Sequence, residues 1–181
     1  MPREPRALGA SVRARLLERA RAERSDFQIY LTRYALERLL YRLSVSEHRN
    51  SFVLKGAMLF VTWVADPFRS TRDLDLLGFG ESDAATLAEC FRAICRQPVA
   101  DDGVTFDIAG LEAAPIREAM EYGGVRIRTR ATIAGASIPI QIDVGFGDAI
   151  TPAAVEIVYP VLLDAPAPTL RAYPIETVVA E

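Results

Sequence analysis

The chain has few of the residues that support disulfide, histidine or membrane chemistry. It has only two cysteines, Cys90 and Cys95, which lie five apart in a helical pattern and point to different sides, so no disulfide framework is expected and a reducing compartment fits. The sole histidine, His48, lies in a polar stretch, and histidine acid–base catalysis is not expected. The longest apolar run, Ala57 to Ala65, is far too short to span a membrane, and the first residues lack the apolar stretch of a signal peptide. These absences favour a cytoplasmic protein.

Positive charge is carried almost entirely by arginine. The 181 residues are half apolar, which is enough for one ordinary domain with a buried core. The net charge of −3 argues against a general nucleic-acid binder. Lys55 is the only lysine, against twenty arginines, which fits either a specific role beside Gly56 or chance. Eleven arginines fall in residues 1–50, which we predict to be an Arg-rich helical N-terminal segment.

The most informative motif is Asp73-Leu74-Asp75, within an apolar run that ends at Gly78. The pattern predicts a strand, in which side-chain direction repeats every two residues. Both carboxylates then point from one face, roughly 6.5–7 Å apart, while the leucines enter the core. Two anions held that close repel each other unless a cation lies between them. Mg²⁺, which is usually held by one or two carboxylates plus substrate phosphates, is the cation that fits best.

Two further segments extend this candidate site. Residues 138–144 alternate cleanly between apolar and polar, and they place Asp143 on a β-branched strand, where Asp is depleted. Upstream, residues 52–60 predict a short strand, a glycine turn at Gly56 and a buried helix. A glycine there lets backbone N–H groups at the helix start approach an anion closely. The chain therefore offers a phosphate cradle at Gly56, the Asp73/Asp75 pair and a separate carboxylate at Asp143.

The periodicity as a whole predicts an α+β fold with a small mixed sheet and an N-terminal helical region. A capping box headed by Ser25 predicts the start of the second helix. Arg126, Arg128 and Arg130 alternate with apolar residues, as on a half-buried antiparallel strand that forms a hairpin with the Asp143 strand. These arginines fit a solvated sheet face or a track for an RNA backbone, and alternation alone does not separate the two. Helices are expected at 10–24, 25–43, 56–64 and 82–96, and strands at 52–54, 73–79, 104–108, 125–131 and 138–144.

Together these segments resemble the polymerase-β-like nucleotidyltransferase superfamily. The stretches LKGAMLF, Arg69 to Leu76 and Gln141 to Asp148 are similar to the AbiEii branch, which includes toxins of type IV toxin–antitoxin and phage-defence systems. The stretches Val158 to Leu163 and Tyr173 to Glu181 share the resemblance, which covers the chain from about Ser25 onward. The resemblance implies a nucleotidyltransferase core at 51–165, followed at 166–181 by a linker and the start of a C-terminal helix.

The resemblance also implies an activity: transfer of a nucleotide from a nucleoside triphosphate to a hydroxyl, such as a tRNA 3′ end, with an antitoxin as protein partner. Asp73, Asp75 and Asp143 would be catalytic and would bind two Mg²⁺ or Mn²⁺ ions. The triphosphate would be held at the cradle by a set of candidate residues: Lys55, Gly56, Ala57, Arg69 and Thr71.

Two departures keep other functions open. Family members usually have Gly-Gly or Gly-Ser at the cradle, where this sequence has Gly56-Ala57. They also continue into a helical region that carries a Lys and a further Asp, whereas this sequence stops at Glu181, about two turns after Pro174, and we expect a C-terminal helix that is cut short. A catalytically degenerate binding module, and transfer to a protein hydroxyl, are the alternatives.

Overall fold

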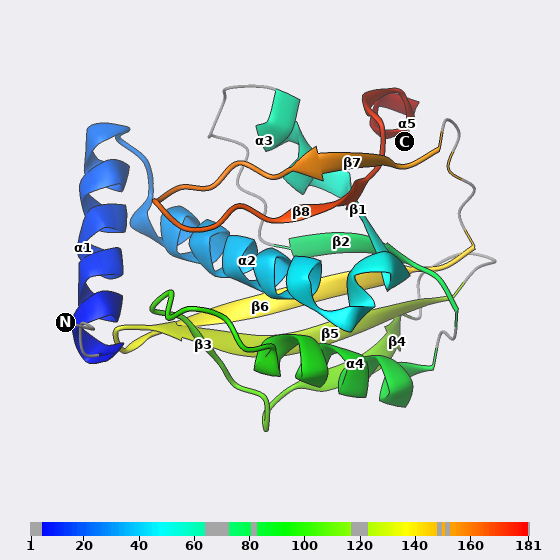
Figure 1. Cartoon of the computed structure of the whole chain (residues 1–181), viewed down its shortest axis with the longest axis horizontal. Coiled ribbons are helices and arrows are strands. Elements are labelled where there is room, and N and C mark those ends of the chain that lie inside the picture. The colour runs from blue at the N-terminus through cyan, green and yellow to red at the C-terminus, as the bar shows by residue number, and fades with distance from the viewer. Residues whose placement is uncertain are drawn as a thin grey trace.

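The fold is organised around one mixed β-sheet, and helices α2 and α4 pack on one of its faces (Figure 1). The structure is a computed structural model, and it describes residues 5–63, 73–80, 83–116, 123–147, 150 and 153–180. The predicted α+β fold with a mixed sheet is confirmed. No helix within these ranges is long and apolar enough to cross a bilayer.

The helices vary widely in length. Two long helices, α1 and α2, come first, and the 3₁₀ turn η1 leads into the sheet. The 3₁₀ turn η2 and the single-turn helix α3 follow the first strand, and α4 and α5 come later. Their bounds are α1 Pro5–Ala22, α2 Phe27–Val45, η1 Glu47–Ser51, η2 Gly56–Leu59, α3 Phe60–Trp63, α4 Ala84–Arg96 and α5 Ile175–Ala180.

The sheet has the strand order β3-β5-β6-β2-β1-β8-β7, with β4 also paired to β5. Strands β2 and β6 run parallel, as do β1 and β8, and the other pairs are antiparallel. The bounds are β1 Phe52–Lys55, β2 Asp73–Gly78, β3 Thr105–Phe106, β4 Glu112–Ile116, β5 Gly124–Ile133, β6 Ala136–Gly145, β7 Val155–Val158 and β8 Thr169–Ala172. The long β5–β6 hairpin therefore lies beside β2, which carries the Asp73/Asp75 motif.

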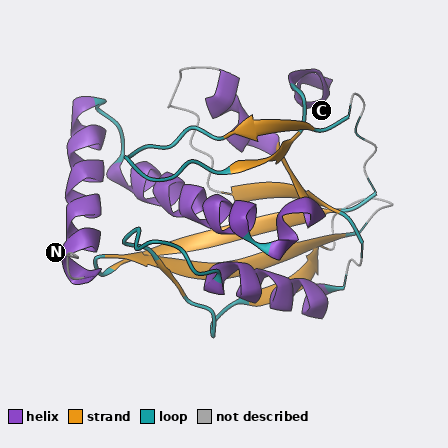
Figure 2. Cartoon of the chain, in the orientation of Figure 1, coloured by secondary structure: helices purple, strands orange, loops and turns teal. Residues whose placement is uncertain are grey.

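The core lies between the sheet and the helices α2 and α4 (Figure 2). Apolar residues at alternate strand positions, such as Leu74 and Ile142, are buried against these helices. Phe52 of β1 contacts Phe91 of α4, with ring centroids 5.3 Å apart. Because strand side chains alternate, the residues between them point to the opposite face, where the predicted carboxylates lie.

Buried charged groups fix α2 to its surroundings. Glu37 is fully buried, where its carboxylate accepts a hydrogen bond from the Leu162 backbone N–H at 3.0 Å and lies 3.3 Å from Arg33 Nε. Burial raises the pKa of Glu37 to about 7. Further along α2, Arg42 donates two hydrogen bonds to Asp102, at 2.6 and 3.1 Å, which anchors the loop before β3.

Several local expectations need correction. The cap of α2 is Asp26, whose side chain accepts from the Gln28 N–H, rather than Ser25. The segment after Gly56 is not one helix but η2 followed by α3, since a positive φ at Gly56 starts a 3₁₀ turn. Strand β8, at residues expected to form a linker, adds to the sheet beside β1. The short strands β4 and β7 were not predicted.

Candidate active site

The strand register places four charged residues in one transverse row on the face opposite α2. Lys55 on β1 pairs with Asp75 on β2, Asp75 lies beside Asp143 on β6, and Asp143 lies opposite Arg126 on β5. Adjacent strands are about 4.8 Å apart, so the two aspartates are close neighbours. The row thus has two carboxylates in the centre and one cation at each end.

The Asp143 carboxylate is bound by Arg126. The guanidinium donates from Nε to Oδ1 at 2.8 Å and from Nη2 to Oδ2 at 2.7 Å. The Asp143 side chain is 20% exposed and that of Arg126 is 35% exposed, so water screens this pair only in part. Such a bidentate contact is among the stronger polar interactions in proteins. Arg126 therefore holds both oxygens of the third predicted carboxylate.

Gly56 lies directly against Asp75. Its φ is +73°, and a Cβ there would lie 2.9 Å from the Asp75 Cβ and closer still to the carboxylate oxygen Oδ2. A glycine is thus required here for backbone conformation and for space. The turn at Gly56 therefore packs directly against strand β2. The helix dipole contributes less to anion binding than predicted, because the helical segments that follow Gly56 are single turns.

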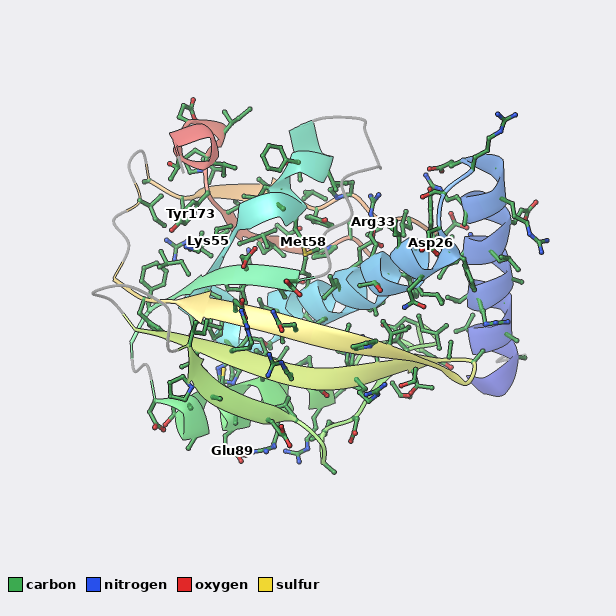
Figure 3. The ribbon with its side chains drawn as sticks, turned by 180° about the vertical axis from the view of Figure 1, so that it is seen from behind. Asp26, Arg33, Lys55, Met58, Glu89 and Tyr173 are labelled. Atoms are coloured by element: carbon green, nitrogen blue, oxygen red, sulfur yellow. The ribbon has the colours of Figure 1, made fainter. Side chains whose placement is uncertain are left out.

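Lys55 crosses the same face toward β6. A Cβ at Gly145 would lie 3.7 Å from Lys55 Nζ, so the small residue on β6 leaves room for the ammonium group. On the other side, Nζ lies 5.7 Å from the ring centroid of Tyr173, a buried residue that follows β8 (Figure 3). A cation over an aromatic face at this distance is attracted by the ring. Tyr173 and Gly145 therefore define where the one lysine of the chain lies.

Asp73 lies one row further along β2. Its strand neighbour is Gln141, which is opposite Arg128 on β5. Asp73 also lines a hollow of about 710 Å³ that extends over β5 and β6. In Figure 3, which views the molecule from behind, β6, β5 and β4 lie in front of α2, so this face of the three strands carries neither α2 nor α4.

The three carboxylates fit a divalent cation in type and in register. All are oxygen donors, which Mg²⁺ prefers, and they come from one face of two adjacent strands. Their side chains do not form a ready ligand cluster, because within the described residues no three acidic, histidine or cysteine side chains gather as a metal site. Arg126 donates to both oxygens of Asp143, so a cation at that carboxylate would compete with it.

Some predicted site residues lie outside the described chain. Arg69 and Thr71 lie outside the residues that the structure describes. Ala57 is the second residue of η2 and is half-buried.

Sequence reasoning missed the role of Arg126 and of Tyr173. The hairpin register carried a signal for Arg126. A two-residue turn at Ala134–Gly135 pairs Ile133 with Ala136, and counting back along both strands puts Arg126 opposite Asp143. No local signal in the sequence indicates the contact between Tyr173 and Lys55, because strands β1 and β8 are far apart in the chain.

Two solved structures align with most of the chain. The JHP933 protein of Helicobacter pylori aligns over 84% of this chain and 55% of its own, at 14% identity and a TM-score of 0.53. A second H. pylori chain, described as a candidate nucleotidyltransferase, aligns over 81% of this chain and 53% of its own, at 14% identity and a TM-score of 0.48. The present chain thus spans about half the length of these two proteins.

A search of curated proteins found no match. Residues 38–181, which are most of the chain and include every predicted site residue, match the family described as nucleotidyl transferase AbiEii toxin, type IV TA system. With the cradle, the acidic strand and the third aspartate in one row, the chain belongs to the AbiEii family of nucleotidyl transferase toxins.

Proposed function

We propose that this protein transfers a nucleotide from a nucleoside triphosphate to an acceptor hydroxyl. The acceptor oxygen attacks the α-phosphorus, the bond from that phosphorus to the oxygen bridging the β-phosphate breaks, and pyrophosphate leaves. The observation that carries the proposal is the row in which Lys55, Asp75 and Asp143 lie side by side, with Gly56 against Asp75, in a chain of this family.

The triphosphate binds at the β1 end of the row. Gly56 keeps the backbone of the cradle accessible, and the Lys55 ammonium lies beside it as a point charge for the phosphates. Arg69 and Thr71 remain candidates for the same task. Preorganised donors aimed at charge that develops on the leaving group are usually the largest contribution to such a reaction.

The acidic residues lie at the reacting centre. Asp73, Asp75 and Asp143 would hold Mg²⁺ or Mn²⁺, which supplies charge neutralisation at the phosphate oxygens when bound. Asp143, nearest to β5, is placed to take the proton of the acceptor hydroxyl on its carboxylate once Arg126 has released it. Arg126 would then be free to pair with a phosphate oxygen instead.

The physiological acceptor and partner are proposed from the family. A toxin of a type IV system implies an antitoxin protein, and an RNA 3′ end such as that of tRNA is the acceptor we propose. A binding module without catalysis is the second candidate. It is favoured by Ala57 in the cradle and by Arg126, which occupies both oxygens of Asp143.

A labelling assay tests the transfer. The protein is incubated with each α-³²P nucleoside triphosphate, Mg²⁺ and total RNA, and the products are resolved on a denaturing gel. We expect label in RNA with wild type and none with Asp75→Asn, which keeps the size of the side chain and removes its charge. Arg96→Gln, on the exposed side of α4, is the matched control and should label normally. Equal labelling by Asp75→Asn would refute the mechanism, and no label from folded wild type would favour the binding module.

A further inference from the structure

The hollow beside Asp73 has a lining that the reaction described above does not use. Its wall includes Gln28 and Thr32 at the start of α2, and Arg128, Arg130, Ser137 and Gln141 on the β5–β6 hairpin. Strand β2 begins at Asp73, opposite Gln141, so it does not extend alongside the hairpin residues that precede Gln141. The hollow therefore begins at Asp73, one row along the strands from Asp75 and Asp143.

Its position relative to the cradle has a mechanistic consequence. In a displacement at phosphorus, the attacking and the leaving oxygen lie roughly in line on opposite sides of the reacting atom. Lys55 and Gly56 lie on the β1 side of the carboxylates, so pyrophosphate leaves toward β1. The attacking oxygen must then come from the β6–β5 side, where the hollow lies.

We infer that this hollow is the acceptor site, and that Arg128 and Arg130 bind successive phosphates of a single-stranded RNA whose 3′ end reaches Asp143. The inference rests on the proposed function for the direction of attack. Two residues apart on a strand, the two arginines are roughly 6.5–7 Å apart along β5. That is an interval suited to the repeat of an extended phosphodiester chain.

The three arginines on β5 differ in the charge of their hydrogen-bond partners. Arg126 is neutralised by the Asp143 carboxylate. Arg128 and Arg130 are exposed, and each donates from Nε to a neutral partner, Gln141 Oε1 at 3.4 Å and Ser137 Oγ at 2.8 Å. Among the described residues, neither forms an ion pair, so their guanidinium charge is available to a ligand.

Two acids on the outer wall of the hollow provide a test of the sign of the ligand's charge. Asp107 and Glu112 also line it, and Glu112 is opposite Arg128 in register but forms no ion pair with it in the described chain. A polyanion would be repelled by Glu112, whereas a basic peptide would be attracted by it. Neutralising Glu112 and neutralising Arg128 should therefore change RNA affinity in opposite directions.

The experiment measures fluorescence anisotropy of a short 5′-labelled single-stranded RNA, without nucleotide, at several salt concentrations. Arg128→Gln with Arg130→Gln should weaken binding about tenfold and lower the salt slope by about 1.4, since each phosphate contact on a single strand contributes about 0.7. Glu112→Gln should tighten binding about two- to threefold. Arg96→Gln, on α4 over the opposite face, should leave affinity unchanged. All four residues are exposed, and circular dichroism will verify folding.

The same proteins are titrated with a fluorescent ATP analogue and tested for label transfer, which separates this inference from the proposed function. Unchanged nucleotide binding with weakened RNA binding supports the acceptor site. Unchanged RNA binding by the double variant, in a protein whose wild type labels RNA, would overturn the acceptor site and leave the activity standing. Arginine-dependent RNA binding without any transfer by wild type would overturn the activity and keep the RNA site. Transfer to a protein in place of RNA would overturn the acceptor assigned here.

Discussion

Gly56→Ala is an informative perturbation of the site because the cost of a positive φ can be separated from the cost of steric overlap with Asp75. Gly135, in the β5–β6 turn, has nearly the same φ, +80° against +73° at Gly56. A Cβ at Gly135 meets nothing within 4 Å, whereas one at Gly56 would overlap the Asp75 side chain. Both alanine variants therefore bear the cost of the left-handed conformation, about 1–2 kcal/mol, and only Gly56→Ala adds steric overlap.

We expect the overlap to add about 1–3 kcal/mol, as overpacking typically does. Urea unfolding of the two variants and wild type measures the free energy of unfolding, and Gly56→Ala should be the less stable by that amount. Adding Asp75→Ala should recover part of the difference, because the carboxylate leaves while the Cβ at 2.9 Å stays. Equal destabilisation by the two glycine variants would refute the reasoning that Gly56 is set by Asp75.

The remaining predictions concern buried charge and the two cations of the row. The pKa of Glu37 is raised to about 7, so protonated Glu37 stabilises the folded state fully below pH 4.5, and this stabilisation is lost as pH rises through 7. Urea unfolding should therefore show a fall of about 3 kcal/mol in the free energy of unfolding of wild type over this range, and Glu37→Gln should lack that fall. Arg126→Gln frees Asp143 and should tighten Mn²⁺ binding about three- to tenfold by calorimetry, and an unchanged Kd would contradict the competition. Tyr173→Phe, which keeps an aromatic ring beside Lys55, should keep nucleotide affinity, and Tyr173→Leu should weaken it about threefold by fluorescence titration; equal affinities would exclude a role for the ring.

The features of the site that depend on a few neighbouring residues could be predicted from the sequence. A two-residue period predicts one face for Asp73 and Asp75, and glycine after a short strand predicts the turn at Gly56, because both follow from backbone geometry within a few residues. The register between strands was not predictable in the same way. Asp75 lies beside Asp143 only because β2 and β6, separated by some sixty residues, pair in parallel.

The errors follow from tertiary pairing overriding local preference. Strand β8 is only four residues, Thr169–Ala172, between prolines at 168 and 174, and its local signals favour a linker. It becomes a strand because Tyr173 N–H donates to Leu54 O and β1 offers an otherwise open edge. The same pairing brings the Tyr173 ring under Lys55, so the missed strand and the missed contact have one cause.

The row of charges explains how two carboxylates are tolerated on neighbouring strands. Two unit charges about 4.8 Å apart repel by about 3.5 kcal/mol at an effective dielectric constant of 20, and water reduces this for partly exposed groups. Lys55 lies beside Asp75 and Arg126 lies opposite Asp143, so each carboxylate has a cation at its outer side. A cation bound at Asp143 would compete with Arg126 for the carboxylate oxygens. We therefore expect Arg126 to stabilise the row without metal and to weaken metal binding at Asp143.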